Sequence, residues 1–102
     1  MTFRVRLTRD AEHDLARRYG FILDRDVNDW EIAERALQAI RDAFRSLELS
    51  PFSFRKAEVG NPLLREIVIP FGSAGYVALF EIEDSQTVTV LAVRHLREDD
   101  YY

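Results

Sequence analysis

The sequence predicts a single α+β domain made of an N-terminal strand, an antiparallel helical hairpin and a three-stranded antiparallel meander. Apolar residues recur at helical spacing through residues 9–23 and 30–47, whereas residues 63–95 alternate as strands do. The connections between these segments are short, which favours antiparallel neighbours. At 102 residues the chain has the size of one domain, so we assign residues 1–102 to it.

The composition argues against several kinds of site. The chain has no cysteine, and His13 and His95 lie far apart, so we expect no disulfide, no metal and no cofactor. No apolar run approaches the roughly 18 residues of a membrane span. The charged N-terminus lacks the apolar segment of a signal peptide. We therefore expect a cytoplasmic protein with no membrane partner.

The charge balance bears on nucleic-acid binding. The net charge of −4 gives no bulk attraction to nucleic acid, and we do not expect direct binding to it. All but one of the 14 basic residues are arginine, and arginine favours fixed bidentate or stacked contacts over diffuse charge. Local basic patches therefore stay open as a hypothesis.

The first elements are predicted from residues 3–23. Residues 3–7 alternate apolar and basic side chains, which predicts a short strand at a sheet edge or beside a strand of the later sheet. Thr8 is the expected N-cap of a helix over residues 9–23, because acidic residues follow it in the first turn.

The second helix is the clearest element. Asn28 and Glu31 resemble a capping box, and the helix is expected to end by Ser50-Pro51. Its apolar stripe, from Trp30 to Leu47, is assigned to the core. The connection to the first helix is short, so the two helices should form an antiparallel hairpin.

The segment over residues 50–62 is predicted to be a loop. It contains two prolines, one glycine and the aromatic residues Phe52 and Phe54 beside the pair Arg55-Lys56. Two interpretations stay open: the loop contacts a partner, or its phenylalanines cap the core.

Both faces of the predicted meander carry apolar side chains. The helical hairpin can cover only one face of a small sheet, and an open apolar patch on a monomer calls for a use. We therefore expect the second face to bind another polypeptide. Its residues are assigned by strict alternation and by position at the strand ends: Arg65, Ile67, Ile69, Leu91, Val93, His95 and Arg97.

A family resemblance follows from the order of the elements and from short motifs. These motifs are Ala11 with Asp14-Leu15, Leu47 before Ser50-Pro51, Leu64-Arg65-Glu66, Gly75-Tyr76, and Val93-Arg94-His95 followed by Arg97. Over nearly the whole chain they resemble the ParE/RelE superfamily of type II toxin–antitoxin toxins. The resemblance implies a small toxin that causes growth arrest, neutralised when the C-terminal segment of a cognate antitoxin folds onto it.

Two targets compete within this superfamily. ParE-like members inhibit DNA gyrase without obvious catalytic residues, whereas RelE-like members cleave mRNA on the ribosome with a basic cluster. Val77 stands where RelE carries an arginine, which, with the negative charge and the long hairpin, favours ParE. If the chain were an endoribonuclease, the resemblance leaves as candidate catalytic residues Arg65, His95, Arg97 and Tyr102.

The favoured reading is thus a ParE-like gyrase inhibitor that is not an enzyme. The alternatives are a ribosome-dependent mRNA endonuclease and an inactive binding module of the same fold. Two candidate residues also have structural interpretations. Arg65 on an apolar strand face is expected to pair with a carboxylate, and His95 at a strand end is typical of a structural or surface histidine.

Overall fold

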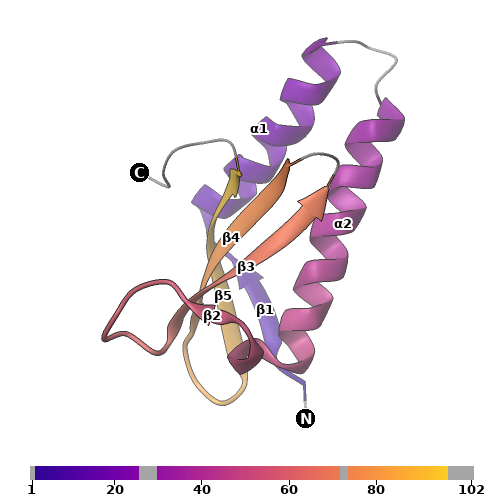
Figure 1. Cartoon of the computed structure of the whole chain (residues 1–102). Helices are drawn as coiled ribbons and strands as arrows, with labels where there is room; N and C mark the ends of the chain where they lie inside the picture. The colour runs from indigo at the N-terminus through magenta and orange to yellow at the C-terminus, as the bar shows by residue number, and fades with distance from the viewer. Residues whose placement is uncertain (1, 26–29, 72–73, 97–102) are drawn as a thin grey trace.

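The computed structural model describes residues 2–25, 30–71 and 74–96, in which two helices cover one face of a mixed five-stranded sheet (Figure 1). The elements follow in this order: β1 (Arg4–Leu7), α1 (Arg9–Arg25), α2 (Trp30–Leu49), the 3₁₀ helix η2 (Pro51–Ser53), β2 (Arg55–Lys56), β3 (Leu64–Phe71), β4 (Ala74–Ile82) and β5 (Thr87–His95). The α+β class is confirmed. No helix among the described residues is both long and apolar enough to span a membrane.

The predicted meander forms the centre of a larger sheet. Strands β3, β4 and β5 are antiparallel neighbours, but the full order is β1-β5-β4-β3-β2. β1 pairs parallel to β5, with Arg4 opposite Thr87. The predicted three-stranded meander is therefore only part of the sheet: the N-terminal strand joins it, as one interpretation allowed, and β2 was not predicted. β2 lies in the segment predicted as a loop, because its two residues are too few to produce a recognisable alternation.

Local contacts fix the helix ends. Thr8 Oγ1 accepts a hydrogen bond from the Ala11 N–H at 3.1 Å, which confirms the predicted N-cap. The same hydroxyl donates to the Leu91 carbonyl oxygen at 3.1 Å and so ties the start of α1 to β5. α1 extends to residue 25 rather than 23, and α2 ends before Pro51 as predicted. The expected cap Asn28 lies outside the described residues.

The core lies between the helices and the sheet. Phe80, Val90 and Val93 of the sheet are fully buried, and they form one cluster with Ile40 of α2. Burying a side chain of this size contributes about 1.5–3 kcal/mol. Trp30 was wrongly assigned to this core. It is 55% exposed in the first turn of α2, where the hairpin extends past the sheet (Figure 1).

A β-bulge changes which residues of β5 share a face. The register passes from Leu79 opposite Ala92 to Phe80 opposite Val90, so Leu91 is the extra residue. On β5 the helix-side residues are therefore even-numbered before the bulge and odd-numbered after it. The strict alternation predicted for residues 87–95 was wrong at this point.

The two ends of β4 have distinct backbone requirements. Near its start Gly75 has φ +125°, and a Cβ there would lie 2.3 Å from the Ile69 carbonyl oxygen, so only glycine fits. At the β4–β5 turn, Asp84 Oδ1 accepts a hydrogen bond from the Gln86 N–H at 2.7 Å. This hydrogen bond lowers the pKa of Asp84 below its usual value.

The two phenylalanines of the predicted loop behave differently. Phe54 packs edge-on against Phe80, with ring centroids 6.3 Å apart, and caps the core as one interpretation expected. Phe52 stays exposed, with its ring 6.5 Å from that of Phe3. Of these two phenylalanines, Phe54 caps the core and Phe52 does not.

Candidate functional site

The sheet face opposite the helices is the candidate partner-binding surface, and we call it the open face. Residues that pair directly across strands share a face, so the registers define its members. Row by row they are Arg4 and Thr87; Arg6, Thr89, Glu81 and Leu64; Ala92, Leu79, Glu66 and Arg55; and Arg94, Val77 and Val68. The rows near the β4–β5 turn are polar, and the rows towards the other end are more apolar.

The open face holds two ion pairs at its polar positions and one buried hydroxyl. Arg6 Nη1 lies 3.8 Å from Glu83 Oε2, and Arg55 Nε lies 2.6 Å from Glu66 Oε1. Within the described part of the chain, the buried Thr89 Oγ1 has no hydrogen-bond partner. Such a group costs about 1–3 kcal/mol. The Thr89 hydroxyl is therefore a destabilising group within these rows.

The apolar rows centre on Val77. It lies between Val68 and Arg94 on the open face, and it is buried by its surroundings. Val68 is 40% exposed and Leu79 is half-buried. The position at which RelE carries an arginine is therefore a buried apolar position among the rows of the open face.

A buried carboxylate, that of Asp14, binds the exposed edge of β5 beside the open face. Asp14 of α1 is 5% exposed, and its Oδ2 accepts a hydrogen bond from the Val93 N–H at 2.9 Å. The same oxygen pairs with Arg94, and Oδ1 accepts a hydrogen bond from Arg17 at 3.0 Å. Because β1 ends at Leu7, Asp14 satisfies a backbone group of β5 that lies beyond this strand.

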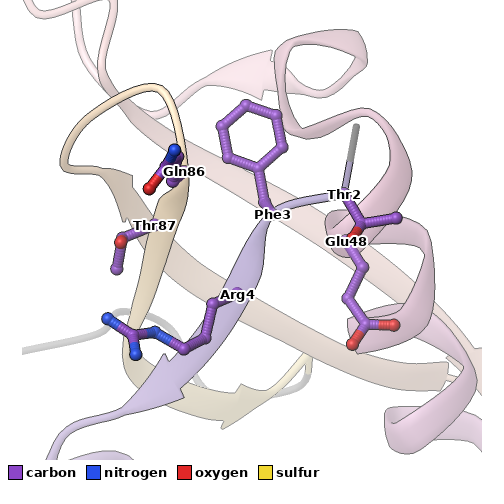
Figure 2. A pocket seen from close by; sticks show the side chains of 6 residues that line it. All are labelled: Thr2, Phe3, Arg4, Glu48, Gln86 and Thr87. Carbon is purple, nitrogen blue, oxygen red and sulfur yellow. The ribbon is translucent and has the colours of Figure 1, made fainter.

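An open pocket of about 620 Å³ lies at the start of β1 (Figure 2). Its lining residues are Thr2, Phe3, Arg4, Glu48, Gln86 and Thr87. Figure 2 shows the Arg4 guanidinium and the Glu48 carboxylate on opposite sides of β1, so these charges do not converge on one ligand. Among residues 2–25, 30–71 and 74–96, no group of three acidic or histidine side chains is placed to hold a metal ion.

Three residues of the predicted partner surface lie in the core. Ile67, Ile69 and Val93 are buried on the face that the helices cover. A partner could reach them only by displacing the helices, so their assignment to an exposed face was wrong. Leu91 is half-buried at the bulge, and Arg97 lies outside the described residues. Alternation could not identify the covered face, because both faces carry apolar side chains.

The described candidates for catalysis do not come together. Arg65 pairs with Phe80 on β4, whereas His95 pairs with Tyr76 and packs edge-on against its ring at 5.6 Å. Residues 76 and 80 are four positions apart, which is roughly 13 Å along a strand. The other candidates, Tyr102 among them, lie outside the described residues. The described part of the predicted ribonuclease cluster is therefore not assembled.

Arg65 instead holds backbone carbonyl groups. Its Nε donates to the Pro62 oxygen at 2.7 Å, and its Nη1 donates to the Phe54 oxygen at 2.7 Å and the Phe52 oxygen at 3.1 Å. Its guanidinium carbon also lies 5.3 Å from the centroid of the Phe52 ring. The structural interpretation of Arg65 thus fits, but its partners are carbonyls and an aromatic ring rather than the expected carboxylate.

Comparison with known families places this surface in context. Residues 5–100 match the family model of the ParE toxin of the type II toxin–antitoxin system parDE. The chain belongs to the ParE toxin family. A chain of the chromosomal ParDE toxin–antitoxin system from P. aeruginosa has a similar fold, with a TM-score of 0.72 and 18% identity over 93% of this chain and 97% of that chain. The search of curated proteins gave no match.

In this ParE toxin family member, sequence reasoning missed the contact between Asp14 and Arg94. Both residues belong to the motifs that carry the family resemblance, but the motifs alone do not predict their contact. A signal was present, because Asp14 lies between Ala11 and Leu15 on the inward side of α1. A carboxylate within an apolar stripe predicts a buried partner, since a buried charge is costly when it is unpaired.

Proposed function

We propose that this ParE-family toxin inhibits DNA gyrase in the cytoplasm and that a cognate antitoxin neutralises it. The family match over residues 5–100 carries the proposal. The separation of Arg65 from His95 supports it, because these groups do not converge where an RNA phosphate could be attacked. The toxin would then act through contact surfaces rather than through acid–base groups.

The open face is our proposed docking surface for the C-terminal segment of the antitoxin. Val68 and Leu79 offer apolar contacts there, and the exposed Arg4 favours an acidic side chain at the polar end. This face replaces the surface expected from strict alternation. The P. aeruginosa structure is that of a ParDE toxin–antitoxin system, which supports an antitoxin as the partner.

The function is tested with the purified free protein in two parallel assays. We expect it to block gyrase supercoiling, to leave translated mRNA uncut in primer extension, and to lose its effect when the antitoxin is added. Cuts that disappear in a folded His95→Ala variant would instead support the endonuclease. Activity in neither assay, without growth arrest on expression, would support the inactive binding module.

The docking surface has a matched control. Val68→Asp should weaken antitoxin binding at least about tenfold, or 1.4 kcal/mol, because it places a charge in an apolar contact. Ile32 on α2 is 41% exposed, against 40% for Val68, and it lies on a helix rather than on the open face. Ile32→Asp should therefore leave the Kd unchanged in isothermal titration. Equal losses in the two variants would contradict the assignment.

A further inference from the structure

The helical hairpin has an apolar groove on its outer side. The groove has a volume of about 350 Å³ and lies between α1 and α2. It is lined by Leu15 and Ala16 of α1 and by Glu34 and Leu37 of α2. Ala16 and Glu34 are exposed, so the groove opens to solvent rather than to the sheet. The described part of the chain therefore leaves this apolar surface uncovered.

The groove lies on a longer stripe along α2. Residues three and four positions apart share one side of a helix. Trp30 precedes Glu34 by one turn, and Arg41 follows Leu37 by one turn, so these two residues extend the groove at its ends. Trp30 is 55% exposed, and Arg41 is exposed as well. The buried residues of α2 lie on another side of the helix: Ala33, Ala36, Ile40 and Leu47.

The order of charges along this stripe makes it complementary to a second copy of itself. Glu34 lies three residues before Leu37, and Arg41 lies four residues after it. If two α2 helices cross antiparallel at Leu37, each Glu34 lies beside Arg41 of the other copy, and a two-fold axis relates the two pairs. A parallel arrangement in register would instead bring like charges together. The charges therefore select an antiparallel second copy as the occupant.

We propose that this groove is the interface of a homodimer, in which the α2 helices of two copies pack antiparallel across Leu37. Leu37 and Ala16 supply apolar contacts, and the pairs between Glu34 and Arg41 fix the register. The helices cover the sheet face opposite the open face, so the open face stays accessible in both copies (Figure 1). The interface involves neither gyrase nor the antitoxin, and its test is therefore separate from that of the proposed function.

Sedimentation equilibrium of the purified full-length protein measures the dimer Kd, and the fluorescence of Trp30, the only tryptophan of the chain, reports on the groove. The emission maximum should move to shorter wavelength over the concentrations at which the mass doubles, because the second copy covers this exposed ring. Ala16→Asp should raise the dimer Kd at least tenfold, since it places a charge in an apolar contact. Ile32→Asp is the control and should leave the dimer Kd unchanged, because Ile32 lies nearly opposite Glu34 around the helix axis.

A charge exchange distinguishes the interface from a folding defect. Glu34→Arg and Arg41→Glu each place like charges at both pair positions of a homodimer, so each should raise the dimer Kd at least tenfold. An equimolar mixture of the two variants should form dimers again, because each variant supplies the charge that the other lacks. The melting temperatures of both variants should stay close to the wild-type value, since both residues are exposed.

Three results would overturn the homodimer interface. If the wild type stays monomeric up to about 1 mM, the dimer does not form. If dimers form but neither Ala16→Asp nor the charge variants weaken them, the two copies meet through another surface. If the cognate antitoxin shifts the Trp30 emission of dilute, monomeric toxin and Ala16→Asp weakens that binding, the groove is an antitoxin site instead.

Discussion

Replacing Asp14 by alanine is the sharpest test of how the helical hairpin is attached to the sheet. The carboxylate is nearly buried between α1 and the β5 edge. It accepts a hydrogen bond from the backbone of Val93 and pairs with Arg94 and Arg17. Asp14→Ala removes all of these contacts at once and leaves a buried N–H without its acceptor.

The size of the effect follows from the separate contacts. Breaking a buried ion pair costs about 3–5 kcal/mol, and we take about 3 kcal/mol because the Arg94 side chain is 22% exposed. The unpaired Val93 N–H adds about 1 kcal/mol. Arg17 is 61% exposed, so its contact contributes less than about 1 kcal/mol. The expected loss of about 4 kcal/mol is a large part of the roughly 5–15 kcal/mol that stabilises a typical domain.

Urea-induced unfolding measures this loss. Asp14→Asn should fall between the wild type and Asp14→Ala, because the amide keeps an acceptor oxygen but has no charge to pair with Arg94. Arg17→Ala is the control, since it touches the same carboxylate from the exposed side and should cost less than about 1 kcal/mol. If the free energy of unfolding of Asp14→Ala lies within about 1 kcal/mol of the wild-type value, the attachment of the hairpin does not depend on this carboxylate.

Unfolding experiments test other contacts. Arg65→Ala removes three hydrogen bonds to carbonyl oxygens and should lower the free energy of unfolding by about 2–4 kcal/mol. A loss below about 1 kcal/mol would show that these hydrogen bonds do not stabilise the fold. Gly75→Ala forces a backbone overlap and should cost at least about 3 kcal/mol, whereas Gly60→Ala, with open space around its Cβ, should cost about 1–2 kcal/mol; equal losses would refute the overlap. Thr89→Val removes an unpaired buried hydroxyl and should stabilise by about 1 kcal/mol; destabilisation would reveal a partner for it.

The elements that the sequence could predict are those with a periodic pattern. The stripe of α2 and the alternation of β3 and β4 extend over many residues, so the pattern is visible without the fold. The short strand β2 has two residues, and its pairing with β3 depends on a distant segment. The parallel pairing of β1 with β5 joins residues 4 and 87, and no local pattern encodes such a contact.

The face that a partner can reach was harder to predict, for a physical reason. Apolar side chains line both faces of β3, so burial could not be assigned from hydrophobicity. The extra residue Leu91 then exchanges the faces of β5, and nothing in the residues 87–95 marks a bulge there. As a result Val93 was expected at the surface and lies in the core. The family resemblance does not depend on which face of the sheet is exposed, so the wrong face assignment left it unaffected.

The arginine-rich composition has a structural explanation that bears on function. On the strands, Arg6 pairs with Glu83, Arg55 with Glu66 and Arg94 with Asp14. Arg65 binds carbonyl oxygens in the same way. Each of these guanidinium groups would have to leave an internal partner before it could bind an RNA phosphate, and the net charge of −4 gives no long-range attraction to offset that loss. These four arginines therefore serve contacts within the fold, which argues against their use as a phosphate-binding cluster.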